Sequence, residues 1–401
     1  MSSVSAVAEF LGLKRNVALL LAAVILTGAG EEMWMRFLPK YLEALGATVA
    51  IIGLFDALKT LLGAVYAFPG GILVDRWGHR RAFVTFTVLS MAGYVLLFLV
   101  PHWTAVIGGA FLYLAWSNFS LPGTFSLVGA SLPPDKHAMG IGVQSLVKRI
   151  PVLIGPVAGG ILLDRLGVVS GVRAGAAISV GLGALAAALQ NRISDERAPA
   201  GKGTRLSLSL TGFSPSLKQL LLSDILIRFC ERIPYAWVVI YAMDHVGASA
   251  AQVGVLIAVE MLVAMATYIP VARLADRYGK EPFVIATFVF FTFFPLAMAA
   301  ADTYGLLLVA FAIRGLKEFG EPSRKALIIQ HAPAEARGRT IGAYYLIRDT
   351  IVTAGSFLGA ALWIAGPAAN FGAAALVGAA GTVFYVVTLR RRKNHPTISA
   401  P

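Results

Sequence analysis

The sequence predicts an all-α membrane protein with twelve transmembrane helices in two parallel six-helix halves. Three observations predict this fold class. Of the 401 residues, 57% are hydrophobic and only 14% are charged; the mean hydropathy is +0.75; and apolar runs of about 20 residues recur along the whole chain. Such runs fit membrane-crossing helices, because a barrel strand needs only about 10 residues and alternates strictly.

The first six spans occupy the amino-terminal half of the chain. Each is an apolar run closed by polar residues, where a helix leaves the hydrocarbon. Their expected bounds are 16–38, 48–71, 82–101, 104–130, 139–163 and 172–190. The first run is too long for a signal peptide and contains Glu31, Glu32 and Arg36, so we expect it to be retained as a span.

Six further spans follow a polar segment that is rich in serine, glycine and charge. Their expected bounds are 217–241, 250–273, 283–301, 303–327, 339–363 and 367–389. The predicted domains are therefore an N-terminal half at 1–190, a cytoplasmic linker at 191–216 and a C-terminal half at 217–401.

The two halves are copies of one unit, because a shift of 200 or 201 residues aligns them. The matched identical residues include Asp75, Arg76 and Gly78 with Asp276, Arg277 and Gly279, and Gly155 and Gly159 with Gly355 and Gly359. Six is an even number, so both copies enter the membrane from the same side. This arrangement predicts parallel halves related by an axis along the membrane normal.

The basic residues indicate orientation. The net charge is +13, and 22 of the 34 Lys and Arg residues fall in segments on one side, which the positive-inside rule assigns to the cytoplasm. We therefore expect a multi-pass protein of the cell membrane with both termini cytoplasmic, no nucleic-acid partner and a monomeric state. The single cysteine, Cys230, lies in a span and permits no intramolecular disulfide.

Charges inside the spans mark a polar interior. A charged side chain facing lipid at mid-bilayer costs at least about 2.5–3.5 kcal/mol, so these groups are expected to face one another or a water-filled cavity. Apart from Arg173 at the start of the sixth, the third, sixth, ninth and twelfth spans carry no charge and are predicted to form the outer, lipid-facing scaffold. The candidates for lining a substrate cavity are Arg36, Lys59, Lys148, Arg149, Arg232, Glu260, Arg314, Glu318, Arg348 and Asp349.

Spacing predicts which of these charges pair. Acids and bases four residues apart share a helix face; such pairs are Glu32 with Arg36, Asp224 with Arg228, Arg314 with Glu318, and Lys317 with Glu321. Three aligned positions exchange sign between the halves: Lys59 with Glu260, Glu31 with Arg232, and Arg149 with Asp349. We expect opposite charges to face each other across a central cavity. Structural salt bridges are the alternative reading.

Proton binding requires a carboxyl group whose charge can be neutralised inside the membrane. Burial favours the neutral form and a neighbouring base opposes it. Glu31, Glu32 and Asp56 are the candidates. The sequence does not show which of them binds the proton.

The stretch "GILVDRWGHRR" between the second and third spans resembles the loop motif of the major facilitator superfamily of secondary transporters. The matching residues are Gly71, Asp75, Arg76, Gly78, Arg80 and Arg81, and the second copy retains Asp276, Arg277 and Gly279. The resemblance covers the whole chain. It implies that the motif aspartate is a conformational latch, which engages the start of a helix in the other half.

The fifth span contains the stretch "GPVAGG", which partially resembles the motif of proton-driven antiporters in that family. Gly155, Pro156, Gly159 and Gly160 match, whereas Pro151 replaces a glycine. A generic packing seam of small residues is the alternative. The fourth span lacks the arginine that such antiporters usually carry.

We therefore predict a secondary transporter that moves a small organic or amphipathic solute by alternating access, with proton-coupled efflux favoured. Uptake of an organic anion with protons is the first alternative, and a membrane sensor without catalytic activity is the second. No HExxH, GxSxG or P-loop pattern occurs, so no enzyme is expected. No cofactor or metal is expected, and the proton gradient is the expected energy source.

Overall fold

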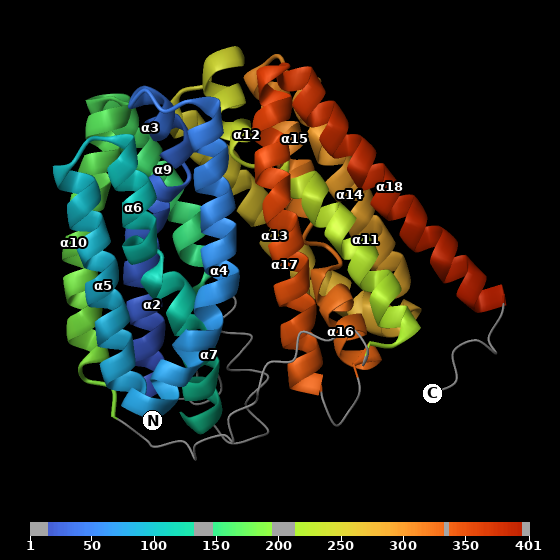
Figure 1. Ribbon diagram of the computed structural model, residues 1–401, viewed down its shortest axis with the longest axis horizontal. Coiled ribbons are helices and arrows are strands. Elements are labelled where there is room, and N and C mark those ends of the chain that lie inside the picture. The colour runs from blue at the N-terminus through green and yellow to red at the C-terminus, as the bar shows by residue number, and fades with distance from the viewer. Residues whose placement is uncertain (1–14, 132–146, 195–212, 333–336, 395–401) are drawn as a thin grey trace. The chain divides into compact units, whose positions relative to one another are not determined.

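The described part of the chain is helical. The computed structural model describes residues 15–131, 147–194, 213–332 and 337–394 (Figure 1), and no strand occurs within these ranges. The predicted all-α class is confirmed. Most of the predicted linker at 191–216 lies outside the described residues.

The chain divides into two compact units, which interleave in sequence. Unit 1 contains residues 1–47, 62–203 and 249–258, and unit 2 contains 48–61, 204–248 and 259–401. The first part of the second span therefore packs in unit 2, and the first turns of the eighth span pack in unit 1.

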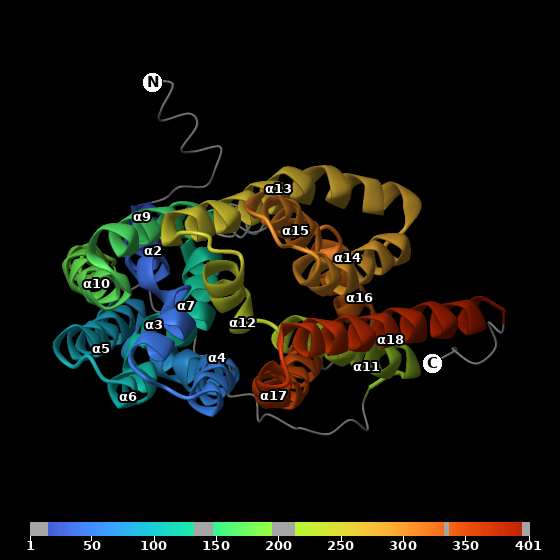
Figure 2. The ribbon, with the colours of Figure 1, turned by 90° about the horizontal axis from the view of Figure 1, so that it is seen from above.

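Unit 1 is built around its first helix. The helices of this part of the chain are α2 (Arg15–Met35), α3 (Leu38–Ala44), α4 (Val49–Trp77), α5 (His79–Leu99), α6 (Trp103–Tyr113), α7 (Ala115–Ser131), α9 (Arg149–Leu166) and α10 (Val168–Gln190). Helix α2 packs against α9 and α10, while α5 packs against α6 and α10 (Figure 2).

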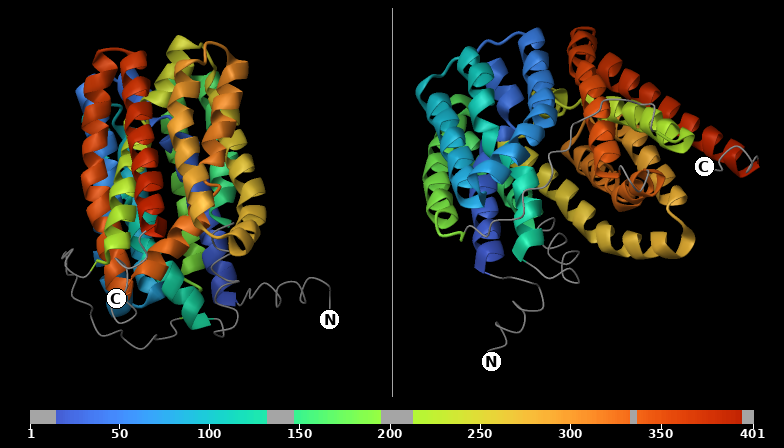
Figure 3. Two further views of the ribbon diagram at one scale, coloured as in Figure 1. Left: turned by 90° about the vertical axis from the view of Figure 1, so that its right-hand side faces the viewer. Right: turned by 60° about the horizontal axis from the view of Figure 1, so that its bottom comes forward.

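Unit 2 repeats this order of elements. Its helices are α11 (Pro215–Arg232), α12 (Trp237–Ile240), the π-helical turn η3 (Tyr241–His245), α13 (Ala250–Tyr278), α14 (Glu281–Ala299), α15 (Tyr304–Leu316), α16 (Glu321–His331), α17 (Arg337–Ile364) and α18 (Pro367–Asn394). Helices α17 and α18, drawn in orange and red, pack against α11 and against each other (Figure 3).

The seventh and tenth spans are not continuous, which the sequence prediction missed. The seventh stops at Arg232 and resumes at Trp237 as α12, and the tenth stops at Leu316 and resumes as α16. Pro234 lies in the first of these breaks and Pro322 in the first turn of α16; a third proline, Pro39, lies in the first turn of the short helix α3 that follows the first span. Proline has no backbone N–H and fits the start of a helix better than its interior.

Nine helices of the described ranges are long and apolar enough to cross a membrane. The fifth, seventh and tenth predicted spans are not among them. Helix α9 carries three charged residues and α11 five, and the tenth span is broken in two. The spans that fall short are thus among those in which the sequence places charge.

Apolar packing holds each unit together, and apolar side chains also cover the outer helices. In unit 1, Leu20, Phe83 and Trp116 belong to one buried cluster; in unit 2, Leu217 and Phe288 belong to another. Large apolar side chains are exposed on the four helices predicted to face lipid, among them Val88 and Leu99 on α5, Leu185 on α10, Phe293 on α14 and Leu376 on α18.

Candidate functional site

A buried ion cluster surrounds Asp224 on α11. Its Oδ2 atom accepts hydrogen bonds from Arg324 of α16, from Arg348 Nη1 of α17 at 3.2 Å and from the Tyr344 hydroxyl at 3.1 Å. Arg324 also binds both oxygens of Glu321, at 2.6 Å to Oε1. Three helices of unit 2 are therefore joined through one carboxylate.

A second cluster in unit 2 joins α11, α13 and the break after α15. Glu231 accepts from Arg228 Nη1 at 2.7 Å and from Lys317 Nζ at 2.6 Å. Glu260 of α13 lies 3.3 Å from Arg314 Nε and 3.5 Å from Lys317 Nζ. Arg314 and Lys317 thus have carboxylate partners from other elements, whereas Arg228 and Glu231 both lie on α11.

Two predicted pairs are confirmed and two are wrong. Arg36 Nε lies 2.8 Å from Glu32 Oε2, and Arg228 Nε lies 4.0 Å from Asp224 Oδ1. The pairs Arg314 with Glu318 and Lys317 with Glu321 do not share a helix face, because α15 ends at Leu316 and α16 begins at Glu321. The break redirects Arg314 and Lys317 towards Glu260 and Glu231.

The start of α4 is attached to unit 2 by Asp56. This buried carboxylate accepts from Arg232 Nη1 at 3.1 Å and from the Ser356 hydroxyl at 2.6 Å. Nearby, a Cβ on Gly53 would lie 2.6 Å from the Ala360 Cβ, so the two helices approach closely. Arg232 thus pairs with Asp56 rather than with Glu31, and the predicted facing of opposite charges across a cavity stays a prediction.

Three cations of unit 2 surround the ring of Tyr235, in the break between α11 and α12. Lys59 Nζ lies 4.7 Å from the ring centroid, and the guanidinium carbons of Arg232 and Arg314 lie at 4.5 and 5.7 Å. Arg232 and Arg314 also hold carboxylates. For Lys59, no carboxylate of the described residues lies within salt-bridge distance. Cations over a tyrosine face are attracted by the ring quadrupole.

Glu31 occupies a different environment in unit 1. Its side chain is buried, with 8% of the residue exposed, and Oε1 accepts from the Tyr94 hydroxyl at 2.7 Å. The Trp34 ring makes edge contacts with Tyr94 and Tyr113, and its Nε1 donates to Ser179 at 2.9 Å. Within the described ranges, no base lies at salt-bridge distance from Glu31. Of the three proton-binding candidates, Glu32 and Asp56 have arginine partners.

The small residues of α9 bring backbones together. A Cβ on Gly159 would lie 1.7 Å from the Met33 carbonyl oxygen of α2, and one on Gly160 would lie 2.2 Å from the Ala250 carbonyl oxygen. A Cβ on Gly155 would meet Glu32 at 2.6 Å. Lys148 and Arg149, half-buried, stand at the start of the same helix. The role of these residues in transport stays a prediction.

In both copies of the loop motif, the glycine that follows the Asp-Arg pair has a left-handed backbone conformation. Gly78 has φ of 79° and Gly279 has φ of 90°, conformations that side chains rarely adopt. Arg80 Nε donates to Asn191 Oδ1 at 2.9 Å, whereas Gly71, Asp75 and Arg76 lie at the end of α4. Asp75 is exposed. Asp276 belongs to α13, but its side chain lies outside the described residues. The latch stays a prediction.

Asp164, which the sequence analysis did not select, caps α13. It accepts from the backbone N–H groups of Ala250 at 2.8 Å and Ala251 at 3.0 Å, and from the Ser249 hydroxyl at 2.8 Å. Ser249 and Gln252 also form a reciprocal capping box. The residues "SAAQ" were a readable signal for this helix start, but nothing in the sequence pointed to Asp164.

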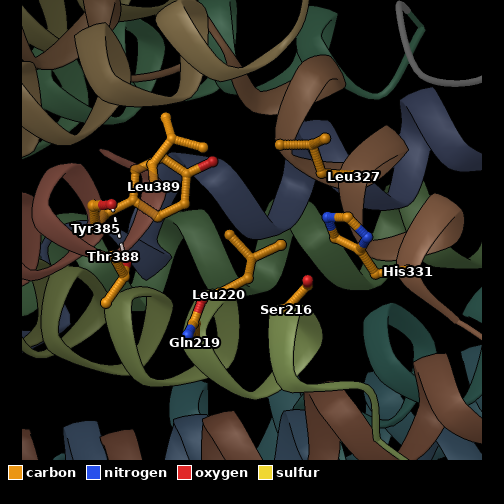
Figure 4. A pocket seen from close by; sticks show the side chains of 8 residues that line it. All are labelled: Ser216, Gln219, Leu220, Leu327, His331, Tyr385, Thr388 and Leu389. Carbon is orange, nitrogen blue, oxygen red and sulfur yellow. Dashed lines mark hydrogen bonds between the residues drawn. The ribbon is translucent and has the colours of Figure 1, made fainter. Parts of the chain in front are cut away.

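One small cavity lies in unit 2 between α11, α16 and α18 (Figure 4). Its volume is about 10 Å³, and Ser216, Leu327, His331 and Tyr385 are among its lining residues. A space of this size holds at most one water molecule, so it is no substrate site. Among the described residues, no group of three His, Cys, Asp or Glu side chains could hold a metal ion.

The chain is similar to bacterial drug-resistance proteins over almost its whole length. "Multidrug resistance protein MdtG" of Escherichia fergusonii is 25% identical over 403 residues, covering 95% of this chain and 96% of that protein. "Tetracycline resistance protein, class C" of Escherichia coli is 24% identical over 413 residues, covering 94% and 98%.

Solved structures share the fold. The crystal structure of a POT family transporter in complex with 5-aminolevulinic acid has a TM-score of 0.78, covers 96% of this chain and 97% of its own, and is 12% identical. At that identity the likeness concerns the fold alone, and the predicted twelve-span fold is confirmed. The family model described as "Major Facilitator Superfamily" matches residues 20–230 and 220–401. Because these matches take in both halves, the chain belongs to the Major Facilitator Superfamily.

Proposed function

We propose that this multi-pass membrane transporter exports a small organic or amphipathic compound across the cell membrane, as a monomer driven by the proton gradient and without a cofactor. The names of the two relatives, which refer to multidrug and tetracycline resistance, support export as the direction. Both termini lie in the cytoplasm in this proposal, as the distribution of basic residues favours.

The observation that carries proton coupling is the environment of Glu31. Its carboxyl group is buried in unit 1 and hydrogen-bonded to Tyr94. Protonation of Glu31 removes a charge from a position where the described residues offer no base. Glu32 and Asp56 instead each form an ion pair with an arginine, so their protonation would break that pair. Glu31 is therefore the proposed proton-binding group.

The other residues selected from the sequence are proposed to line the solute path or to stabilise one conformation of the transporter. The cations around Tyr235 and the Glu260 cluster are proposed to border the solute path, together with Lys148, Arg149, Arg348 and Asp349. Asp75 and Asp276 are proposed to stabilise one of the two end states. A carboxylate at a helix N-terminus contributes about 0.3–1 kcal/mol, enough to bias a two-state equilibrium.

Everted membrane vesicles test the proposal. With the vesicle interior acidified, ethidium as a lipophilic-cation probe should accumulate inside vesicles that contain the protein, and a protonophore should abolish the accumulation. Vesicles without the protein are the control. Accumulation that survives the protonophore, or that requires ATP, would contradict proton-coupled export.

Uptake of an organic anion with protons is the second candidate function. It is favoured by the three cations around Tyr235, of which Lys59 has its π contact but no described carboxylate partner. Arginine in particular suits carboxylate and phosphate groups. A positive cluster of this kind accommodates a negatively charged group more readily than a cation.

Ligand-dependent thermal stability separates the two functions. A ligand at 100 times its Kd adds about 2.7 kcal/mol to stability, so the purified protein should show a raised Tm. Stabilisation by ethidium that weakens at low pH supports proton-competed export. Stabilisation by an aromatic carboxylate such as benzoate that strengthens at low pH, and is lost in Lys59→Gln, supports anion uptake.

A further inference from the structure

A cleft of about 640 Å³ lies at one end of unit 1, where α4 ends, α5 begins and α10 ends. Six residues line it: Trp77, Arg80, Arg81, Val84, Thr85 and Asn191. None of them is acidic, and two carry guanidinium groups. The cleft is therefore a positively charged recess beside three helix ends, and the proposed transport step does not use it.

The two arginines of the cleft differ in how they are held. Arg80 Nε donates to Asn191 Oδ1 at 2.9 Å, which attaches the start of α5 to the end of α10 and fixes the direction of this guanidinium. Arg81 is exposed, and no carboxylate of the described residues lies within salt-bridge distance of it. Planar guanidinium groups bind phosphate oxygens with two parallel N–H bonds. The cleft is thus suited to a phosphate group.

The surroundings of the cleft favour a phosphate attached to a lipid. Val84, Val88 and Val95 follow one face of α5 at spacings of four and seven residues, and Val88 is 54% exposed. On the neighbouring helix α10, Ile178 and Leu185 are exposed at a spacing of seven. These apolar surfaces lead from the cleft along the two helices that the sequence assigns to the lipid-facing scaffold.

Trp77 adds an aromatic side chain to the cleft. It is the last residue of α4, its side chain is 43% exposed, and it lines the cleft beside the arginines. Tryptophan is enriched where the hydrocarbon meets the headgroups. A tryptophan beside two arginines, next to an apolar helix face, makes the recess suited to the headgroup level of a membrane.

We propose that this cleft binds the phosphate of an anionic phospholipid, with Arg80 and Arg81 on the headgroup and the acyl chains along α5 and α10. Basic recesses between membrane helices at the headgroup level are physically suited to such lipids. The proposal concerns a lipid site of unit 1 and does not depend on the direction of transport or on the solute.

Native mass spectrometry of the full chain in detergent tests the proposal with phosphatidylglycerol as the probe. Phosphatidylcholine and inorganic phosphate are the comparison ligands. The wild type should retain one phosphatidylglycerol and show a raised Tm with it, while phosphatidylcholine and inorganic phosphate should give neither effect. Each arginine near a membrane surface contributes about 1 kcal/mol to anionic-lipid binding, which corresponds to about fivefold in Kd.

Matched variants locate the site. Arg81→Gln should weaken phosphatidylglycerol binding about fivefold, and the double variant Arg80→Gln with Arg81→Gln should weaken it further. Arg390→Gln with Arg391→Gln removes the same charge from the exposed end of α18 and should leave the retained lipid in place. Arg81→Gln alone remains informative if loss of the Arg80 bond to Asn191 impairs folding.

Three results would overturn the assignment. Equal weakening in the α18 variant would show general charge attraction rather than a site. Stabilisation by inorganic phosphate as strong as by phosphatidylglycerol would show an ion site instead of a lipid site. If Arg81→Gln retained phosphatidylglycerol as well as the wild type does, Arg81 would not bind the lipid phosphate and the assigned site would be wrong.

Discussion

Asp224 shows how a single residue can hold a polar interior together. Its carboxylate is fully buried and bonds Arg324, Arg348 and Tyr344 from two other helices. The sequence placed Asp224 and Arg228 on one helix face, and their 4.0 Å separation agrees. It did not identify Arg324 or Arg348 as partners, because a partner on another helix depends on packing and not on spacing.

Removal of this carboxylate should strongly destabilise the protein. In Asp224→Ala, Arg324 and Arg348 would stay buried with fewer counter-charges, and breaking a buried pair costs about 3–5 kcal/mol. We expect a large fall in Tm in detergent, or loss of the folded protein. The control, Glu32→Gln, removes the half-buried pair with Arg36 at the end of α2, and a pair with this four-residue spacing is worth about 0.3–0.5 kcal/mol. Equal Tm values for the two variants would contradict the assigned role.

At the scale of elements, breaks and close approaches position the charged groups. Pro234 and Pro322 were visible in the sequence, yet the seventh and tenth spans were predicted as continuous, because an apolar run hides a short break. The discontinuities matter because they provide helix ends inside the span region, as in other transporters. The break after α15 moves Arg314 and Lys317 onto Glu260 and Glu231.

The approach of α9 to α2 should tolerate no added side-chain atom at Gly159. An alanine Cβ would stand 1.7 Å from a backbone carbonyl oxygen, so one helix must move. We expect Gly159→Ala to lower folded yield and Tm in size-exclusion and thermal assays. In the matched variant Gly108→Ala the Cβ meets nothing within 4 Å, and about 0.5–1 kcal/mol of helix propensity is gained. A stable Gly159→Ala protein would contradict the close packing.

The Asp164 cap should stabilise the start of α13. Asp164→Ala removes three hydrogen bonds from Ala250, Ala251 and Ser249, and loss of a capping side chain costs about 1 kcal/mol. Hydrogen exchange at the first turn of α13 should rise in this variant, while Asp164→Asn, which keeps one carbonyl acceptor, should lose less. Unchanged exchange in Asp164→Ala would show that the capping box of Ser249 and Gln252 suffices.

At the scale of the whole molecule, the duplication was the most informative sequence signal. It predicted six spans in each copy, and it explains why Gly78 and Gly279 share the same left-handed backbone. It did not predict that the first part of α4 packs in unit 2 or that the first turns of α13 pack in unit 1. Those placements depend on contacts such as the ion pair of Asp56 with Arg232. A contact between two helices leaves no repeating pattern in the sequence.

The two units also differ in chemistry, although they descend from one pattern. Unit 2 contains a connected set of ion pairs around Asp224, Glu231 and Glu260, whereas Glu31 in unit 1 has a tyrosine partner. In our proposal the ion pairs keep unit 2 rigid, and Glu31 changes its charge during transport. The proposed coupling therefore depends on one carboxyl group.

Reconstituted Glu31→Gln protein tests that coupling. Glutamine keeps the size and an acceptor for Tyr94 but cannot exchange a proton. We expect ethidium exchange between equal concentrations to persist in proteoliposomes, while accumulation driven by a pH gradient is lost. Glu32→Gln, which removes the neighbouring carboxylate, should retain gradient-driven accumulation. If Glu31→Gln still accumulates ethidium against its gradient at the wild-type rate, Glu31 is not the coupling group and the proposed mechanism is wrong.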